Sequence, residues 1–186
     1  SNTISYVVKD PNSSACAIVD SVMDIDYAAG RITSEHADEL IEFIRKNDLV
    51  LEWQIDPETG VLHLEDLAKL LEQDVALVCF LHCSNVIGAI NDVAAITALA
   101  KTAGARVCVD GVSYAPHGFP DVDALGCDVY LFSSYKTYGP HQGIMVIRED
   151  WGFELPNQGH YFNGEKLWKR FTPAGEDHAQ IAASAG

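Results

Sequence analysis

Apolar residues are spaced differently in different parts of the chain, and this spacing predicts its secondary structure. Two short apolar runs, residues 4–8 and 15–19, flank a turn-rich connection and predict a β-hairpin. Residues 20–33 show no regular spacing. Apolar side chains three and four positions apart then predict a helix over residues 34–46, and a strand is predicted over residues 49–55.

Beyond residue 60, predicted helices alternate with fully apolar strands. Helical spacing covers residues 64–72 and 91–102, and Asn91 is the predicted N-cap of the second helix. The predicted strands are residues 75–81, 106–109, 129–132 and 143–147. This alternation predicts an α/β fold with three αβα layers around a mainly parallel sheet. The Gly-, Pro- and aromatic-rich residues 151–173 predict a surface loop before a last helix near residue 176.

Polar residues follow three successive strands of the predicted sheet. Asn85 follows the first strand, Asp110 and Ser113 follow the second, and the segment from Ser133 to Lys136 follows the third. Ligands of open parallel sheets bind at the carboxyl ends of the strands. We therefore expect these side chains to meet at one edge of the sheet.

Lys136 and Asp110 are the pair with the clearest chemistry. A lysine at one strand end and an aspartate at the neighbouring end are what pyridoxal 5'-phosphate requires, since the lysine forms a Schiff base and the aspartate pairs with the protonated pyridine nitrogen. The alternative interpretations are a solvated loop lysine and a turn-capping aspartate. His117, His141 and His160 are interpreted as loop residues.

Composition narrows the possible partners. The net charge of −15 argues against nucleic acid and anionic membranes, but a cofactor phosphate can still be held by backbone N–H groups and hydroxyls. No apolar stretch is long enough to span a bilayer and no leader pattern is present, so we expect a cytoplasmic protein. The five cysteines are scattered without a CxxC pair, which fits a reducing compartment. No metal site is predicted at Cys79, His82 and Cys83, because alternate strand residues face opposite sides of a sheet.

Several motifs in register resemble the class V aminotransferase and cysteine desulfurase family, whose members are pyridoxal phosphate enzymes of fold type I. The motifs are residues 84–88, 109–111, 116–117 and 133–140. The resemblance extends from about Trp53 to residue 186. It implies that Lys136 is the Schiff-base lysine and that Asp110 is the partner of the pyridine nitrogen.

The same resemblance implies further cofactor-binding residues. Asn85 would lie near the ring hydroxyl, and Ser113 stands where the desulfurases usually have glutamine. Ser133 would bind the cofactor phosphate. Tyr135 occupies the place of a phosphate-binding histidine, and both residue types can donate a hydrogen bond.

Residues 1–54 instead resemble the start of the metallo-β-lactamase-fold hydrolases. In those proteins the next strand delivers a His-x-His-x-Asp-His metal motif, whereas here residues 56–60 read Asp-Pro-Glu-Thr-Gly. Without these ligands we expect no metallohydrolase activity. The predicted organisation is a metallo-β-lactamase-like β-β-α-β segment over residues 1–54 and a partial pyridoxal phosphate-dependent transferase domain over residues 55–186. A natural recombinant, a truncated gene product and a laboratory chimera would all give such a join.

These observations leave two main functional hypotheses. The first is a pyridoxal phosphate-dependent enzyme, or its remnant, acting on an amino-acid substrate. The second is a catalytically silent α/β scaffold, because the family's upstream phosphate-binding helix start and its substrate-binding arginine are not located in the sequence. In both cases unpaired strand edges predict a homo-oligomer, most simply a two-fold dimer.

Overall fold

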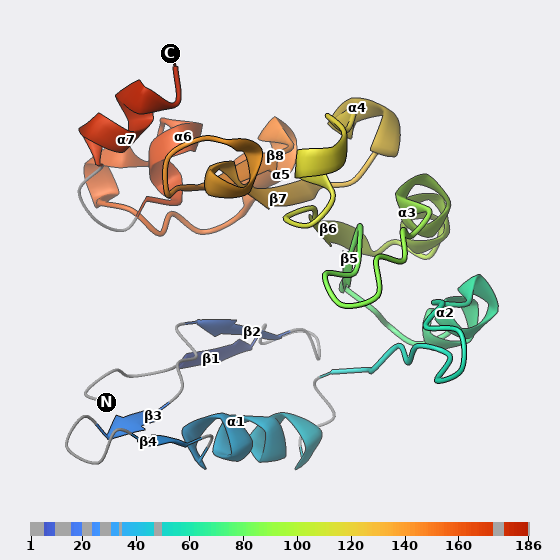
Figure 1. Cartoon of the computed structure of the whole chain (residues 1–186). Coiled ribbons are helices and arrows are strands. Elements are labelled where there is room, and N and C mark those ends of the chain that lie inside the picture. Colours follow the sequence, from blue (N-terminus) through green and yellow to red (C-terminus); the bar gives the residue numbers. More distant parts are fainter. Residues whose placement is uncertain are drawn as a thin grey trace. The chain divides into compact units, whose positions relative to one another are not determined.

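The computed structural model describes residues 6–9, 16–19, 24–26, 31–33, 35–46, 50–172 and 177–185. The chain divides into two compact units, which are described separately (Figure 1). The first unit comprises residues 1–55 and 62–76, and the second comprises residues 56–61 and 77–186.

The first unit begins with the predicted hairpin. Strands β1 (Tyr6–Lys9) and β2 (Cys16–Val19) pair in antiparallel orientation, which confirms that prediction. A second antiparallel pair, β3 (Asp24–Asp26) and β4 (Arg31–Thr33), lies where irregular structure was expected. Strands of three residues are too short to show a period in the sequence, so the prediction was wrong there. The predicted helix is present as α1 (Glu35–Lys46).

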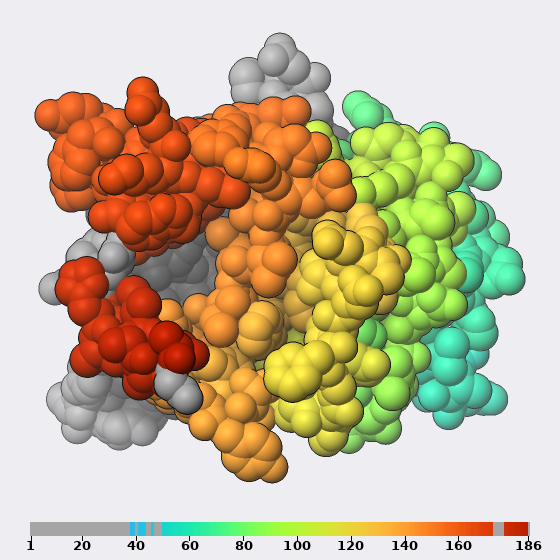
Figure 2. Space-filling view, turned by 90° about the horizontal axis from the view of Figure 1, so that it is seen from above, coloured from blue at the N-terminus to red at the C-terminus, as the bar shows by residue number. Residues whose placement is uncertain are grey.

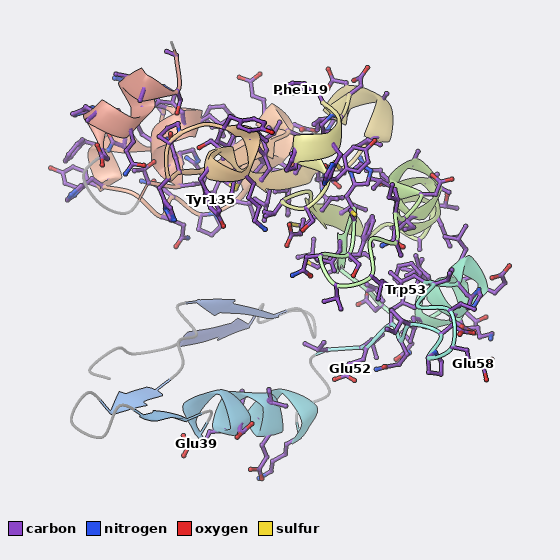
Figure 3. All side chains as sticks on the ribbon, in the orientation of Figure 1. Glu39, Glu52, Trp53, Glu58, Phe119 and Tyr135 are labelled. Atoms are coloured by element: carbon purple, nitrogen blue, oxygen red, sulfur yellow. The ribbon has the colours of Figure 1, made fainter. Side chains whose placement is uncertain are left out.

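A strand was predicted over residues 49–55, but residues 50–55, the described part of that range, have no regular secondary structure. Backbone groups form a strand only when a neighbouring strand takes their hydrogen bonds, and the described residues of this unit supply no such neighbour. A side chain holds this segment instead. The indole of Trp53, labelled in Figure 3, donates a 3.1 Å hydrogen bond to the carbonyl of His63. Helix α2 (Leu64–Leu70) follows directly.

A four-stranded sheet forms the centre of the second unit. Its strands are β5 (Leu77–Leu81), β6 (Arg106–Asp110), β7 (Val129–Ser133) and β8 (Gly143–Ile147). They lie in the order β5-β6-β7-β8, with the first three parallel and β8 antiparallel to β7. The predicted α/β fold with a mainly parallel sheet is therefore confirmed.

One face of this sheet forms the core with α3 (Val93–Thr102). Val107 and Val109 of β6 are both 0% exposed, and α3 packs against this strand. The buried residues of α3 recur at helical spacing, because they form the side of the helix that faces the sheet. Helix α4 (Val122–Leu125) lies beside α3, as the yellow and light-green surfaces of Figure 2 show.

The predicted N-cap of α3 was one residue too early. Asp92 is the N-cap, and its Oδ1 accepts a 3.0 Å hydrogen bond from the backbone N–H of Ala95. The side chain of Asn91 instead donates a 2.7 Å hydrogen bond to the carbonyl of Leu81. Asn91 therefore ties the start of the helix region to the end of β5, next to the loop that carries Asn85.

The opposite face of the sheet contacts α5 (Glu149–Glu154). The guanidinium of Arg106 lies 5.6 Å from the ring centroid of Trp151 and donates a 3.0 Å hydrogen bond to Glu154. Leu77 and Leu81 of β5 point to this same face and stay 41% and 42% exposed. Helical contacts therefore exist on both faces, but this second face is only partly covered.

The segment predicted as a surface loop contains short helices. These are η3 (Tyr161–Asn163) and α6 (Leu167–Arg170). The guanidinium of Arg170 fixes them by donating to the carbonyls of Gly152, Phe153, Leu155 and Gly164. The last helix, α7 (His178–Ala183), begins after its N-cap Asp177, two residues beyond the predicted start, which lies outside the described residues. None of the described helices has the length and apolar character needed to cross a membrane.

Candidate active site

A cavity of about 350 Å³ opens at the carboxyl ends of the parallel strands, a volume within the range of small-molecule sites. It is lined by Cys83, Ser84, Asn85, Gly88, Ser113, Pro116, His117 and Lys136. Three of the residues predicted from the sequence are among them. Asn85 follows β5, Ser113 follows β6, and Lys136 lies on η2 (Ser134–Thr137), directly after β7. The expected meeting of three strand ends is therefore present.

The turn that carries Lys136 is held by its own hydrogen bonds. The hydroxyl of Ser134 donates to the carbonyl of Pro140 at 2.6 Å, and the hydroxyl of Thr137 donates to the carbonyl of Ser134 at 2.9 Å. Tyr138 ends the turn in the left-handed region, with φ of +67°. Ser134 is buried whereas Lys136 is exposed, so a fixed turn presents a solvent-accessible amine to the cavity.

Asp110, Ser133 and Tyr135 do not line the cavity. Asp110 is the last residue of β6, and its Oδ1 accepts a 2.9 Å hydrogen bond from the N–H of Val112. Ser133 is half-buried at the end of β7. Tyr135, labelled in Figure 3, is 45% exposed and stacks on His141 with ring centroids 4.6 Å apart. These three residues lie on the same strand ends and the same turn that carry the cavity residues, but their side chains are not part of the cavity lining.

A buried aromatic cluster supports the strand ends next to the cavity. His82 is 5% exposed, and its Nδ1 is 2.8 Å from the hydroxyl oxygen of Tyr130 on β7. The imidazole also stacks on Tyr114, with centroids 3.6 Å apart and an interplanar angle of 13°. Burial lowers the pKa of His82 and raises that of Tyr130. His82 therefore joins the end of β5 to β7 and to the segment that carries Ser113.

Gly111 has a steric reason to be glycine. A Cβ at this position would lie 2.1 Å from the ring of Tyr130, far inside van der Waals contact. The N–H of Gly111 donates to the carbonyl of Leu131 at 2.7 Å, and its carbonyl accepts from the N–H of Ala115 at 2.9 Å. The Val109-Asp110-Gly111 motif thus lets the chain turn over Tyr130 and enter η1 (Ala115–His117) beside the cavity.

Sequence reasoning missed part of the cavity lining. His117 was interpreted as a loop residue, yet it lines the cavity beside Lys136. The Pro116-His117 dipeptide and the stretch from Ser84 to Gly88 belong to the motifs noted in the sequence, so the signal was present. Nothing in the sequence indicated which side chains of these motifs would point into the cavity.

Solved structures that resemble this chain include cysteine desulfurases, which share its α/β fold. A cysteine desulfurase from Thermococcus onnurineus has a TM-score of 0.52 and 31% identity, over 62% of this chain and 30% of that protein. A NifS-like protein has a TM-score of 0.64 over 80% of this chain and 41% of its own, and at 24% identity it supports the fold alone.

The sequence comparisons then define the family. The pattern of the family described as Aminotransferase class-V matches residues 34–159, so this chain belongs to the class V aminotransferase family. An aminotransferase-like protein of Gibberella zeae is 38% identical over 129 residues, which are 68% of this chain and 32% of that protein. A cysteine desulfurase of Enterobacter sp. is 47% identical over 92 residues, 49% of this chain and 23% of that protein.

These matches also show what share of each relative's length the chain covers. It spans about a third or less of the length of these curated relatives. The family match begins at residue 34, inside the segment that was predicted to be metallo-β-lactamase-like. The metallo-β-lactamase assignment of residues 1–54 stays a prediction.

Proposed function

We propose that this chain carries the cofactor site of a pyridoxal phosphate-dependent enzyme of the aminotransferase or cysteine desulfurase type, acting on an amino acid. One observation carries the proposal. Lys136, Asn85 and Ser113 come from three strand ends and line one cavity of about 350 Å³. Membership of a family whose members are pyridoxal phosphate-dependent supports the same cofactor.

The chemical groups in the cavity lining and on the adjoining strand ends fit this cofactor. Lys136 Nζ would bind the aldehyde carbon, and Asn85 and Ser113 would contact the ring hydroxyl. The hydroxyls of Ser133 and Tyr135 would bind the phosphate. When bound, the cofactor draws electrons away from the α-carbon of an amino-acid substrate.

Asp110 would orient the ring. Its Oδ1 is held by the N–H of Val112, and among the described residues its Oδ2 has no hydrogen-bond partner. The carboxylate is thus fixed in position while one oxygen can accept a hydrogen bond from the protonated ring nitrogen. His117 at the cavity wall adds an imidazole that can exchange a proton with a bound substrate.

Cofactor binding through Lys136 is tested by spectroscopy and chemical trapping. The full chain titrated with pyridoxal phosphate should develop a visible absorption band, and borohydride should fix the cofactor on the peptide that contains Lys136. Lys136→Ala should lose both signals, whereas the exposed Lys166→Ala should keep them. Absence of the band at saturating cofactor, or a label on another lysine, would contradict the proposal.

A catalytically silent domain is the second candidate function. The contacts of three described arginines favour it. Substrate carboxylates are usually bound by arginine. Arg106 is engaged by Asp128 and Glu154, Arg148 by Asp150, and Arg170 by backbone carbonyls. None of these described guanidinium groups lines the cavity.

Thermal unfolding separates the two candidates. A ligand at ten times its dissociation constant stabilises the folded state by about 1.4 kcal/mol. A rise in melting temperature with pyridoxal phosphate would support the cofactor site, and release of product from an amino acid would support turnover. A cooperative transition without any shift would favour the silent domain.

A further inference from the structure

Two cysteines on neighbouring strands of the sheet lie opposite each other, away from the cavity. Cys79 of β5 and Cys108 of β6 are partners in the parallel register. Partner residues of neighbouring strands point to the same face, which here also carries the exposed Leu77 and Leu81. Neither cysteine lines the cavity, so the pair is separate from the proposed cofactor site.

The geometry of the pair meets the requirements of a disulfide. A disulfide joins residues whose Cα atoms lie about 4.4–6.8 Å apart and whose Cβ atoms do not point away from each other. Neighbouring strands lie about 4.7–4.9 Å apart, and residues in register extend their side chains on the same face. The thiol of Cys108 donates a hydrogen bond to the sulfur of Cys79, so the two sulfur atoms are already in contact. A direct bond between them therefore needs no change of strand register.

The two thiols differ in access to solvent and in protonation. Cys79 is exposed, whereas Cys108 is half-buried. The hydrogen bond from Cys108 lowers the pKa of Cys79 to about 7 and raises the pKa of Cys108. Cys79 is therefore the thiol that is accessible and partly ionised near neutral pH, and the thiolate is the nucleophilic form. Redox-sensing cysteines combine such an accessible thiolate with a neighbouring thiol that resolves the first oxidation product.

We propose that Cys79 and Cys108 form a redox-sensitive pair, which glutathione disulfide converts into a disulfide between β5 and β6. The Cys79 thiolate attacks one sulfur of glutathione disulfide, which breaks that S–S bond and releases one glutathione thiolate. Cys108 then loses its proton to solvent and attacks the sulfur of Cys79, which releases the second glutathione thiolate. Two protein thiols are oxidised, and one glutathione disulfide is reduced to two glutathione thiols. The new bond joins the edge strand β5 covalently to β6.

Peptide mapping of the oxidised wild-type chain tests this pair without any variant. After treatment of the full chain with glutathione disulfide, the intact mass should show the loss of two hydrogen atoms from a monomer. Alkylation and trypsin digestion should then give a covalent link between residues 70–101 and 107–136. Each of these peptides contains two cysteines, so fragmentation spectra should place the link at Cys79 and Cys108 and find Cys83 and Cys127 alkylated. Absence of a link, or a link through another cysteine, would overturn the proposal.

Single variants test the order of the two steps. Cys108→Ser should stop at a mixed disulfide with one glutathione on residue 79, because the resolving thiol is missing. Cys79→Ser should lose the protein disulfide and take up glutathione at least tenfold more slowly than Cys108→Ser does. The matched control Cys83→Ser should form the disulfide at the wild-type rate. Glutathione that stays on Cys79 of the wild-type chain would contradict the proposal, because it would show that Cys108 does not reach that sulfur.

Discussion

Among single residues, Asp128 is the most constrained charge in the described part of the chain. It is 1% exposed and precedes β7. Its Oδ2 accepts a 2.8 Å hydrogen bond from the N–H of Val107, and its Oδ1 lies 3.2 Å from Arg106 Nη1 and 3.4 Å from Lys101 Nζ. One carboxylate therefore joins the start of β6, the end of α3 and the start of β7. Burial of such a charge is tolerated only because these partners are present.

Asp128→Ala should lower the free energy of unfolding by about 3–5 kcal/mol, because it leaves a buried N–H and two cations without their acceptor. Urea unfolding followed by circular dichroism measures this change. Asp150→Ala is the matched control, since its pair with Arg148 is exposed on both sides. The control should cost no more than about 1 kcal/mol. Equal losses in the two variants would contradict this account of Asp128.

At the scale of the elements, the cluster of His82, Tyr114 and Tyr130 joins the segments next to the cavity. Three segments far apart in the sequence meet in these rings, and two of them carry the cavity residues Asn85 and Ser113. Because His82 is buried, its pKa in the folded state lies below its ordinary value. The unfolded chain consequently binds a proton more readily than the folded chain, and stability rises with pH in this range.

Folded-state stability should therefore fall as the pH is lowered from about 7.5 through the ordinary histidine pKa of about 6.5. His82→Phe should reduce this pH dependence and should cost about 1–3 kcal/mol at pH 7.5, because it leaves the buried hydroxyl of Tyr130 unpaired. Urea unfolding at several pH values between 5 and 7.5 measures both effects. His141→Phe, at an exposed position, should keep the wild-type slope. An unchanged slope in His82→Phe would contradict the prediction.

For the molecule as a whole, the incompletely covered sheet is the feature that most affects association with another chain. β5 and β8 are the edge strands of the four-stranded sheet, and each exposes apolar side chains. On β8, Met145 is 42% exposed and Val146 is 39% exposed. Unpaired edges with apolar neighbours favour pairing with another chain. The net charge of −15 opposes association at low ionic strength but is screened within about 8 Å at physiological salt.

We therefore expect a homodimer at physiological salt, with a mass twice the 20.3 kDa of one chain. Light scattering after gel filtration at low micromolar concentration measures it. Met145→Lys should shift the mass toward the monomer by placing a charge on the edge strand. Phe119→Lys is the control, because Phe119 is 96% exposed and belongs to no strand (Figure 3). A monomeric wild-type chain would contradict the prediction.

Local patterns in the sequence were sufficient to predict most of the elements. The β1–β2 hairpin, helices α1 to α3 and the strands of the sheet were all indicated by apolar spacing, which reports which side of an element is buried. Predictions were wrong where the structure of a segment depends on a hydrogen-bond partner that lies elsewhere in the chain. Residues 50–55 alternate like a strand but find no pairing neighbour among the described residues of their unit, and the side chain of Asn91 binds the end of β5 instead of capping α3.

The sequence alone also determined that three strand ends would meet, because successive parallel strands end on the same edge of a sheet. Asn85, Ser113 and Lys136 follow from that rule and from the motifs of the class V aminotransferase family. Only the tertiary structure decided that His117 faces the cavity, that His82 contacts Tyr130, and that Cys79 lies opposite Cys108. The physical reason is that strand register and side-chain direction depend on how distant segments pack, and no local pattern records that packing.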